Sequence, residues 1–180
     1  MSSVHQLLRE TEDARQNFIS AVDGLTPQQA AFKPAPDRWC IVEITEHITR
    51  AEQSGIMGMW KALAGYQQGV PVWEGENVNA GLSIEEVVRR TWKEKEIVPE
   101  IAKPQWGGPI DLWITNLKAN AQVLKTLGEN FEGLDLDKII YPHPISGPLT
   151  IRQRFEFLRF HLNRHQGQVE NVTLHPDFPG

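Results

Sequence analysis

Two histidines near the end of the chain are spaced so that they could share a metal ion. His161 and His165 lie four positions apart in the segment FHLNRHQGQVE, residues 160–170. Positions i and i+4 of an α-helix differ by only about 40° around the axis and about 6 Å along it, so two imidazoles placed there can reach one ion. The apolar residues around them indicate that both face the interior of a helical bundle. Six histidines in 180 residues can also give such a pair by chance, as ordinary core residues.

A third histidine stands in the segment DRWCIVEITEHITRAEQ, residues 37–53. His47 comes one position before Ile48, which belongs to an apolar stripe, so it too is expected to face inward. Three imidazoles from two helices supply the protein ligands of a catalytic type of site and leave a position for water or substrate. Nitrogen ligands without thiolates suit a divalent transition metal and do not suit Mg or Ca. Zn, Ni, Fe and Cu all fit this description, and the spacing of the histidines does not choose among them.

The other histidines are weaker candidates. His5 lies in a first helical turn, His143 is followed by proline, and His175 follows the last helix. Neutral imidazole ligands need hydrogen-bond acceptors that fix their tautomers. Glu43 and Asn120 are candidates for this role, with a helix cap or an ordinary polar contact as the alternative for each.

The pattern of apolar residues predicts an all-α protein in which a single domain, residues 1–180, forms a four-helix bundle with one short extra helix and long connecting loops. Ser83 and Glu86 mark the start of the short charged helix, which Pro99 and Pro104 are expected to close. Residues 65–82 form a long connection, and KIIY, residues 138–141, could form a short extended piece. The main helices are expected over residues 4–22, from 37 or 40 to about 63, 109–129, and from 150 onward, where Thr150 and Gln153 form a capping box.

Composition narrows the class of protein. There are 18 Lys and Arg against 23 Asp and Glu, a formal charge of -5, so no basic field attracts a nucleic acid. The chain has no apolar run long enough to span a bilayer, which predicts no membrane partner. Cys40 is the only cysteine, and the N-terminus lacks the pattern of a signal peptide, so we expect a cytoplasmic protein.

Three segments together resemble the DinB-like superfamily, also called the DinB and YfiT-like metalloenzymes. DRWCIVEITEHI is similar to the Trp-Ser-x-x-Glu-x-x-x-His start of the family's second helix. HPISGPLT is similar to its His-Pro-x-x-Gly-x-Leu motif before the last helix, and FHLNRHQGQVE to its His-x-x-x-His-x-x-Gln ending. The resemblance implies a four-helix bundle in which His47, His161 and His165 bind the metal. It also implies that dimers are common, so a homodimer is one expectation.

One position departs from the family pattern. Cys40 stands where the family has Ser, and a thiol caps a helix poorly, so we expect Asp37 to act as N-cap instead. Cys40 is either a reactive thiol at a helix N-terminus or, as the favoured alternative, a small packing residue.

The resemblance implies more about metal than about substrate, because its members include thiol S-transferases, a thiol-dependent isomerase and proteins without known activity. The first hypothesis is a metal-dependent enzyme acting on a small molecule, either a thiol S-transferase that uses a low-molecular-weight thiol or a hydrolase. Arg50, Arg154 and Arg164 are candidates to bind carboxylates of such a thiol, with solvated surface roles as the alternative. The other hypotheses are a non-catalytic metal-binding or interaction protein with a structural metal site, and a metal-free bundle with core histidines.

Overall fold

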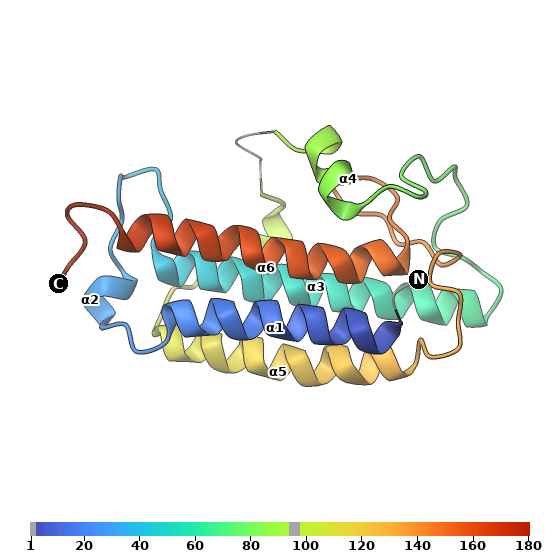
Figure 1. Cartoon of the computed structure of the whole chain (residues 1–180), viewed down its shortest axis with the longest axis horizontal. Helices are drawn as coiled ribbons and strands as arrows, with labels where there is room; N and C mark the ends of the chain where they lie inside the picture. The colour runs from blue at the N-terminus through green and yellow to red at the C-terminus, as the bar shows by residue number, and fades with distance from the viewer. Residues whose placement is uncertain (1–2, 94–97) are drawn as a thin grey trace.

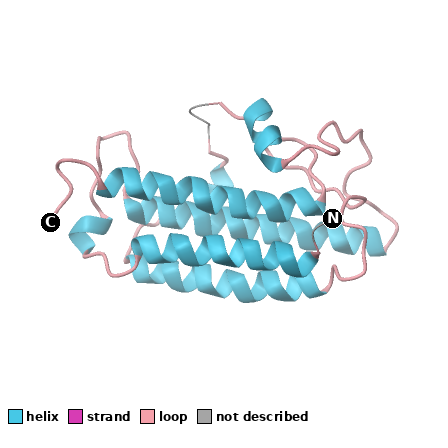
Figure 2. Cartoon of the chain, viewed as in Figure 1, coloured by secondary structure: helices cyan, strands magenta, loops and turns pink. Residues whose placement is uncertain are grey.

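Four long helices form a bundle in the computed structural model, which describes residues 3–93 and 98–180 (Figures 1 and 2). Their bounds are α1 Val4–Val22, α3 Ile41–Gln67, α5 Ile110–Glu129 and α6 Ile151–Thr173. Helix α6 packs against α1 and α3, and α5 packs against the same two helices from the other side. The predicted all-α four-helix bundle is therefore confirmed.

The order of directions explains the long central connection. In Figure 1, α1 and α6 run one way and α3 and α5 run the other. Since α3 and α5 are parallel, the chain must return along the whole bundle between them, and it does so through residues 68–109. This segment carries α4, Ile84–Thr91, and the short 3₁₀ helix η1, Glu100–Ala102.

The short elements differ from the prediction in number and length. Helix α4 ends at Thr91, well before Pro99, because Trp92 adopts an extended backbone and its indole donates to Ser146 Oγ at 2.9 Å. A further short helix, α2 at Pro27–Ala30, was not predicted, although Thr26 and Gln29 form a capping box at its start. The KIIY segment contributes only an isolated β-bridge, between Ile140 and Thr150.

Helix α3 extends to Gln67, four residues beyond the predicted end. Gly65 does not break it; the N–H of Val70 instead donates to the Gly65 carbonyl at 2.8 Å, and Gly69 supplies the positive φ that ends the helix. At the other end the expectation for Asp37 was wrong, because Cys40 is the N-cap residue. The Glu43 carboxylate accepts the Cys40 N–H at 2.8 Å, a contact that needs no hydroxyl at position 40.

Cys40 is a packing residue. Its side chain is buried in the apolar cluster between the C-terminal half of α1 and the N-terminal half of α3. Burial raises the pKa of its thiol, which disfavours the reactive thiolate.

Two apolar clusters fill the two ends of the bundle, and polar residues lie between them. The guanidinium of Arg15 on α1 pairs with Glu52 on α3, and both side chains are almost fully buried. Asn120 of α5 donates to the same carboxylate at 3.2 Å. Within the part of the chain that the structure describes, no helix is both long enough and apolar enough to cross a bilayer.

Candidate metal centre

The three predicted histidines meet where the first half of α3 packs against the middle of α6. His47 lies in the second turn of α3, and His161 and His165 lie on consecutive turns of α6. Their exposed fractions are 5%, 6% and 5%, as the apolar periodicity of the two helices predicted. Among the described residues, these three form a group whose ligand atoms all lie within 4.8 Å of one another.

The separations of the nitrogens suit a single ion. The Nε2 atom of His161 lies 3.3 Å from Nε2 of His47 and 3.0 Å from Nε2 of His165. Two nitrogens bound to one tetrahedral ion at about 2.0 to 2.1 Å lie roughly 3.3 Å apart. The three side chains could therefore hold a metal ion with little movement.

Hydrogen bonds on the outer side of two rings fix their tautomers. Nδ1 of His47 lies 2.8 Å from the carbonyl oxygen of Ala102, which can only accept, so Nδ1 carries the proton and Nε2 carries a lone pair. Nδ1 of His165 lies 2.8 Å from Oε1 of Gln168, which gives His165 the same tautomer. Two lone pairs thus converge on Nε2 of His161, which has at most one proton to offer. A cation satisfies all three nitrogens at once, so the residues fit a metal ion.

Burial keeps the three rings neutral, the form that binds metal. It lowers the pKa of His47 to about 4, and the nearby charge of Arg50 acts in the same direction. Burial also holds the pKa values of His161 and His165 well below their ordinary value, helped by repulsion between the rings when protonated.

The carbonyl that orients His47 is held in place by a charged clamp. The fully buried carboxylate of Glu46 accepts hydrogen bonds from three successive backbone N–H groups, residues 105–107, at 2.7 to 3.2 Å. Arg50 donates to the Lys103 carbonyl, and its guanidinium lies 4.5 Å from the centre of the Trp106 ring. Glu46 and Arg50 on α3 therefore fix the segment that follows η1.

Aromatic rings surround the triad. The ring of Trp39 lies 5.0 Å from His47, and the rings of Phe157 and Trp92 lie 5.3 and 6.2 Å from His161. These apolar walls lower the local dielectric and limit the access of water.

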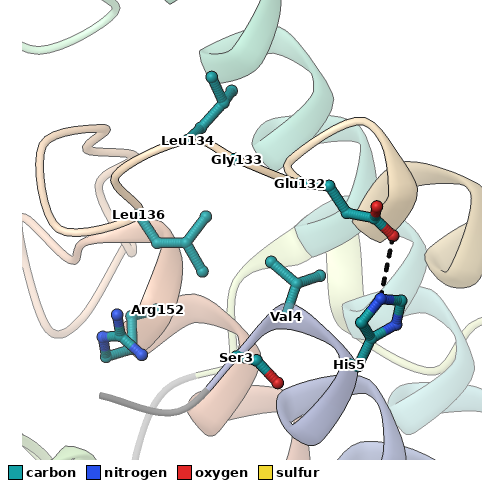
Figure 3. A pocket seen from close by; sticks show the side chains of 8 residues that line it. All are labelled: Ser3, Val4, His5, Glu132, Gly133, Leu134, Leu136 and Arg152. Carbon is teal, nitrogen blue, oxygen red and sulfur yellow. Dashed lines mark ion pairs between the residues drawn. The ribbon is translucent and has the colours of Figure 1, made fainter.

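The other histidines lie outside the group, as the sequence indicated. His5 forms an ion pair with Glu132 at 3.2 Å beside a surface hollow near the start of α1 (Figure 3). His175 packs against Phe32 near the C-terminus. Nδ1 of His143 accepts the backbone N–H groups of Ile145 and Ser146, so this side chain caps a turn.

The two candidate hydrogen-bond partners of the triad, Glu43 and Asn120, bond to other residues. Glu43 bonds to Lys33 and to the Cys40 N–H, and Asn120 donates to the Thr49 carbonyl, which matches the alternative of a cap and a polar contact. The partners are instead Ala102 and Gln168. The sequence signal for Gln168 was its place three residues after His165, whereas a backbone carbonyl such as that of Ala102 leaves no signal.

Comparison with known proteins agrees with this geometry. Residues 10–169 match the DinB superfamily, which is most of the chain and includes all three histidines. The chain is also similar to YuaE of Bacillus subtilis (strain 168), itself described as an uncharacterized protein, with 26% identity over 166 residues that cover 89% of this chain and 93% of YuaE. No solved structure gives a significant match. The chain therefore belongs to the DinB superfamily.

Proposed function

We propose that this protein is a metal-dependent enzyme in which His47, His161 and His165 bind a divalent transition metal ion, with Zn or Ni as first candidates and Fe as another. The observation that carries the proposal is the convergence of two fixed lone pairs on Nε2 of His161. Three neutral ligands leave a coordination position free, and an ion bound there would activate a thiol or water by lowering its pKa. The proposed reactions are transfer of a low-molecular-weight thiol to a small electrophile, or hydrolysis of a small substrate.

The residues of the chain have separate tasks in this proposal. The Ala102 carbonyl and Gln168 hold two of the imidazoles with Nε2 directed inward. Trp39, Trp92 and Phe157 exclude bulk water and so strengthen electrostatic interactions within the site. Glu46, the carboxylate one position before His47, is engaged with backbone N–H groups, so it orients the loop and is not assigned as a general base.

A structural metal site in a non-catalytic protein is the second candidate, and the deep burial of the triad favours it. Closed structural sites have four protein ligands, whereas this group among the described residues has three. Metal that binds and stabilises the fold without supporting any reaction would identify this alternative.

Metal content and activity of matched variants test the proposal. Protein purified without chelators is expected to contain stoichiometric metal, and added Zn or Ni should raise the melting temperature of the metal-free form. His47→Ala should abolish both the metal and the transfer of a small thiol to a chromogenic electrophile. His5→Ala, at the exposed ion pair with Glu132, is the control and should change neither. Thiol transfer that survives in His47→Ala would refute the mechanism, and a protein without metal that gains no stability from Zn or Ni would refute the site.

A further inference from the structure

Arg154 of α6 is a buried cation for which the described residues offer no counter-charge. Its exposed fraction is 5%, and its Nε and Nη1 atoms are enclosed and have no hydrogen-bond partner among the described residues. The other two candidate arginines differ: Arg50 bonds to the Lys103 carbonyl, and Arg164 is exposed and lies over the Trp92 ring. A buried charge without a counter-charge strongly destabilises a fold, so the guanidinium of Arg154 needs a reason to be there.

The guanidinium keeps its charge. Burial lowers the pKa of Arg154 to about 10, which still leaves it protonated at neutral pH. The rings of Tyr141 and Phe157 lie 5.3 and 5.9 Å from its Cζ atom, and cation–π attraction compensates part of the desolvation. Aromatic faces do not replace the hydrogen bonds that the N–H groups lack.

Helix α3 leaves room for this side chain. A Cβ atom at Gly55 would lie 3.3 Å from Nη2 of Arg154, and one at Gly58 would lie 2.0 Å from the ring of Tyr141. Each glycine inside a helix costs about 1 kcal/mol relative to alanine. Two such positions therefore keep space for the guanidinium and for the ring beside it.

The guanidinium and the triad share a contact with one aromatic ring on the same face of α6. Arg154 and His161 are seven residues apart on the same face of α6, or about 10 Å along the axis. The Phe157 ring lies between them, 5.9 Å from Cζ of Arg154 and 5.3 Å from the His161 ring. His143 packs on the same Phe157 ring at 4.4 Å, close enough for its titration to depend on the charge of Arg154.

His143 adds a neutral donor to this place. Its Nδ1 accepts two backbone N–H groups, from Ile145 at 3.2 Å and Ser146 at 3.1 Å, so in the neutral ring the proton is on Nε2. No described residue accepts a hydrogen bond from Nε2. A cation and a neutral N–H donor thus both lie against the Phe157 ring, and Nε and Nη1 of the cation have no acceptor among the described residues.

We propose that Arg154, with His143 beside it, forms a subsite for the carboxylate of an elongated small substrate whose reacting group lies at the triad. The identity of the reacting end rests on the proposed metal-dependent function, whereas the carboxylate contact does not. A carboxylate matches the single positive charge, whereas a phosphate dianion would leave one negative charge buried and unpaired.

The carboxylate contact is tested first on metal-free protein. Millimolar hexanoate, which carries a single negative charge, is expected to raise the melting temperature of the wild-type protein, and its neutral amide, hexanamide, is not. The same shift should occur in His47→Ala, which separates this subsite from the metal centre. No shift with hexanoate, or an equal shift with hexanamide, would overturn the proposal. A shift with inorganic phosphate alone would overturn the assignment to carboxylates.

Substitutions of Arg154 give a second test of the subsite. Arg154→Met keeps the length of the side chain and removes the unpaired charge, so its melting temperature should equal or exceed that of the wild type while the hexanoate shift is lost. Arg159→Met removes an arginine that pairs with Glu85 on the surface, and it should keep the hexanoate shift. If Arg154→Met keeps the shift, the subsite is refuted. If it does not fold, Arg154→Lys, which keeps the charge but loses the planar fork, should retain a weaker shift.

A third measurement joins the two ends of the substrate. On Zn-loaded protein, 6-mercaptohexanoate should bind roughly tenfold more tightly than 6-mercaptohexanol, because only the acid can reach Arg154 while its sulfur lies at the triad. In Arg154→Met the two thiols should bind equally. If the two thiols bind the wild type equally while hexanoate still raises its melting temperature, the carboxylate does not bind beside the reacting group, and the single-substrate arrangement is refuted.

Discussion

The hydrogen bond between Gln168 and His165 is one that a side-chain substitution can remove without touching a proposed ligand. The partner of His47 is the Ala102 backbone carbonyl, so among the described residues outside the triad only Gln168 bonds to one of its rings through a side chain. In Gln168→Ala, the Nδ1–H group of His165 loses its acceptor, and the ring is no longer held with Nε2 directed inward. Loss of such a partner usually weakens metal binding by about 10- to 100-fold, or about 1.4 to 2.7 kcal/mol.

Competition between the protein and a chromogenic chelator for Zn measures this loss directly. Gln166→Ala is the matched control, since Gln166 lies on the same helix and bonds only to Glu170 among the described residues, at 2.9 Å. Denaturation of the metal-free variants should be measured in parallel, because the lost hydrogen bond itself contributes about 1 kcal/mol to folding. Equal Zn affinity in Gln168→Ala and Gln166→Ala would refute the argument that fixed tautomers prepare the site for metal.

Three further predictions concern the scaffold around the site. Gly58→Ala should lower the free energy of unfolding by about 1 to 3 kcal/mol, because the added methyl group meets the Tyr141 ring. Gly167→Ala, whose added methyl group has no neighbour within 4 Å, should raise it by about 1 kcal/mol. Urea denaturation in which both variants change in the same direction would contradict this. Glu46→Gln weakens hydrogen bonds to three backbone N–H groups, so it should lower the free energy of unfolding by roughly 3 kcal/mol and also reduce Zn affinity. A loss of stability with unchanged Zn affinity would show that these hydrogen bonds do not affect metal binding. Burial lowers the pKa of His143 to about 3, so below pH 6.5 the unfolded chain binds more protons at this residue than the folded chain does. The stabilisation that comes from the neutral form of His143 is therefore complete above about pH 6.5 and is lost as the pH falls from about 6.5 to 3. His143→Asn keeps an acceptor for the turn. In metal-free protein it should reduce the slope of the free energy of unfolding against pH by up to about 1.4 kcal/mol per pH unit. An unchanged slope would show that another group is responsible.

The parts of the fold that follow from periodic burial could be predicted from the sequence. The stripe that contains Ile48 fixed the inward direction of His47, and the seam of the last helix did the same for His161 and His165. The start of that helix at Thr150 followed from a local capping pattern, which depends only on neighbouring residues. Helix α2 had a similar signal at Thr26 and could have been found.

The parts that depend on distant pairing could not be predicted. The sequence does not show that Arg15 has a buried counter-charge in Glu52 while Arg154 has none among the residues that the structure describes, because each pairing is decided by which helices become neighbours. The position at which η1 packs against α3 is likewise decided only when the chain folds. It places the Ala102 carbonyl against His47, fifty-five residues away in sequence.

The use of a main-chain carbonyl at Ala102 bears on how such a centre can be inherited or engineered. Any residue that fits the buried position offers the same oxygen, so substitutions at 102 can accumulate during evolution without disturbing the imidazole that depends on it. Conversely, grafting the three histidines onto another helical scaffold would transfer the ligands and leave this acceptor behind. A functional graft would need the loop of residues 99–107 together with Glu46, the side chain that anchors it.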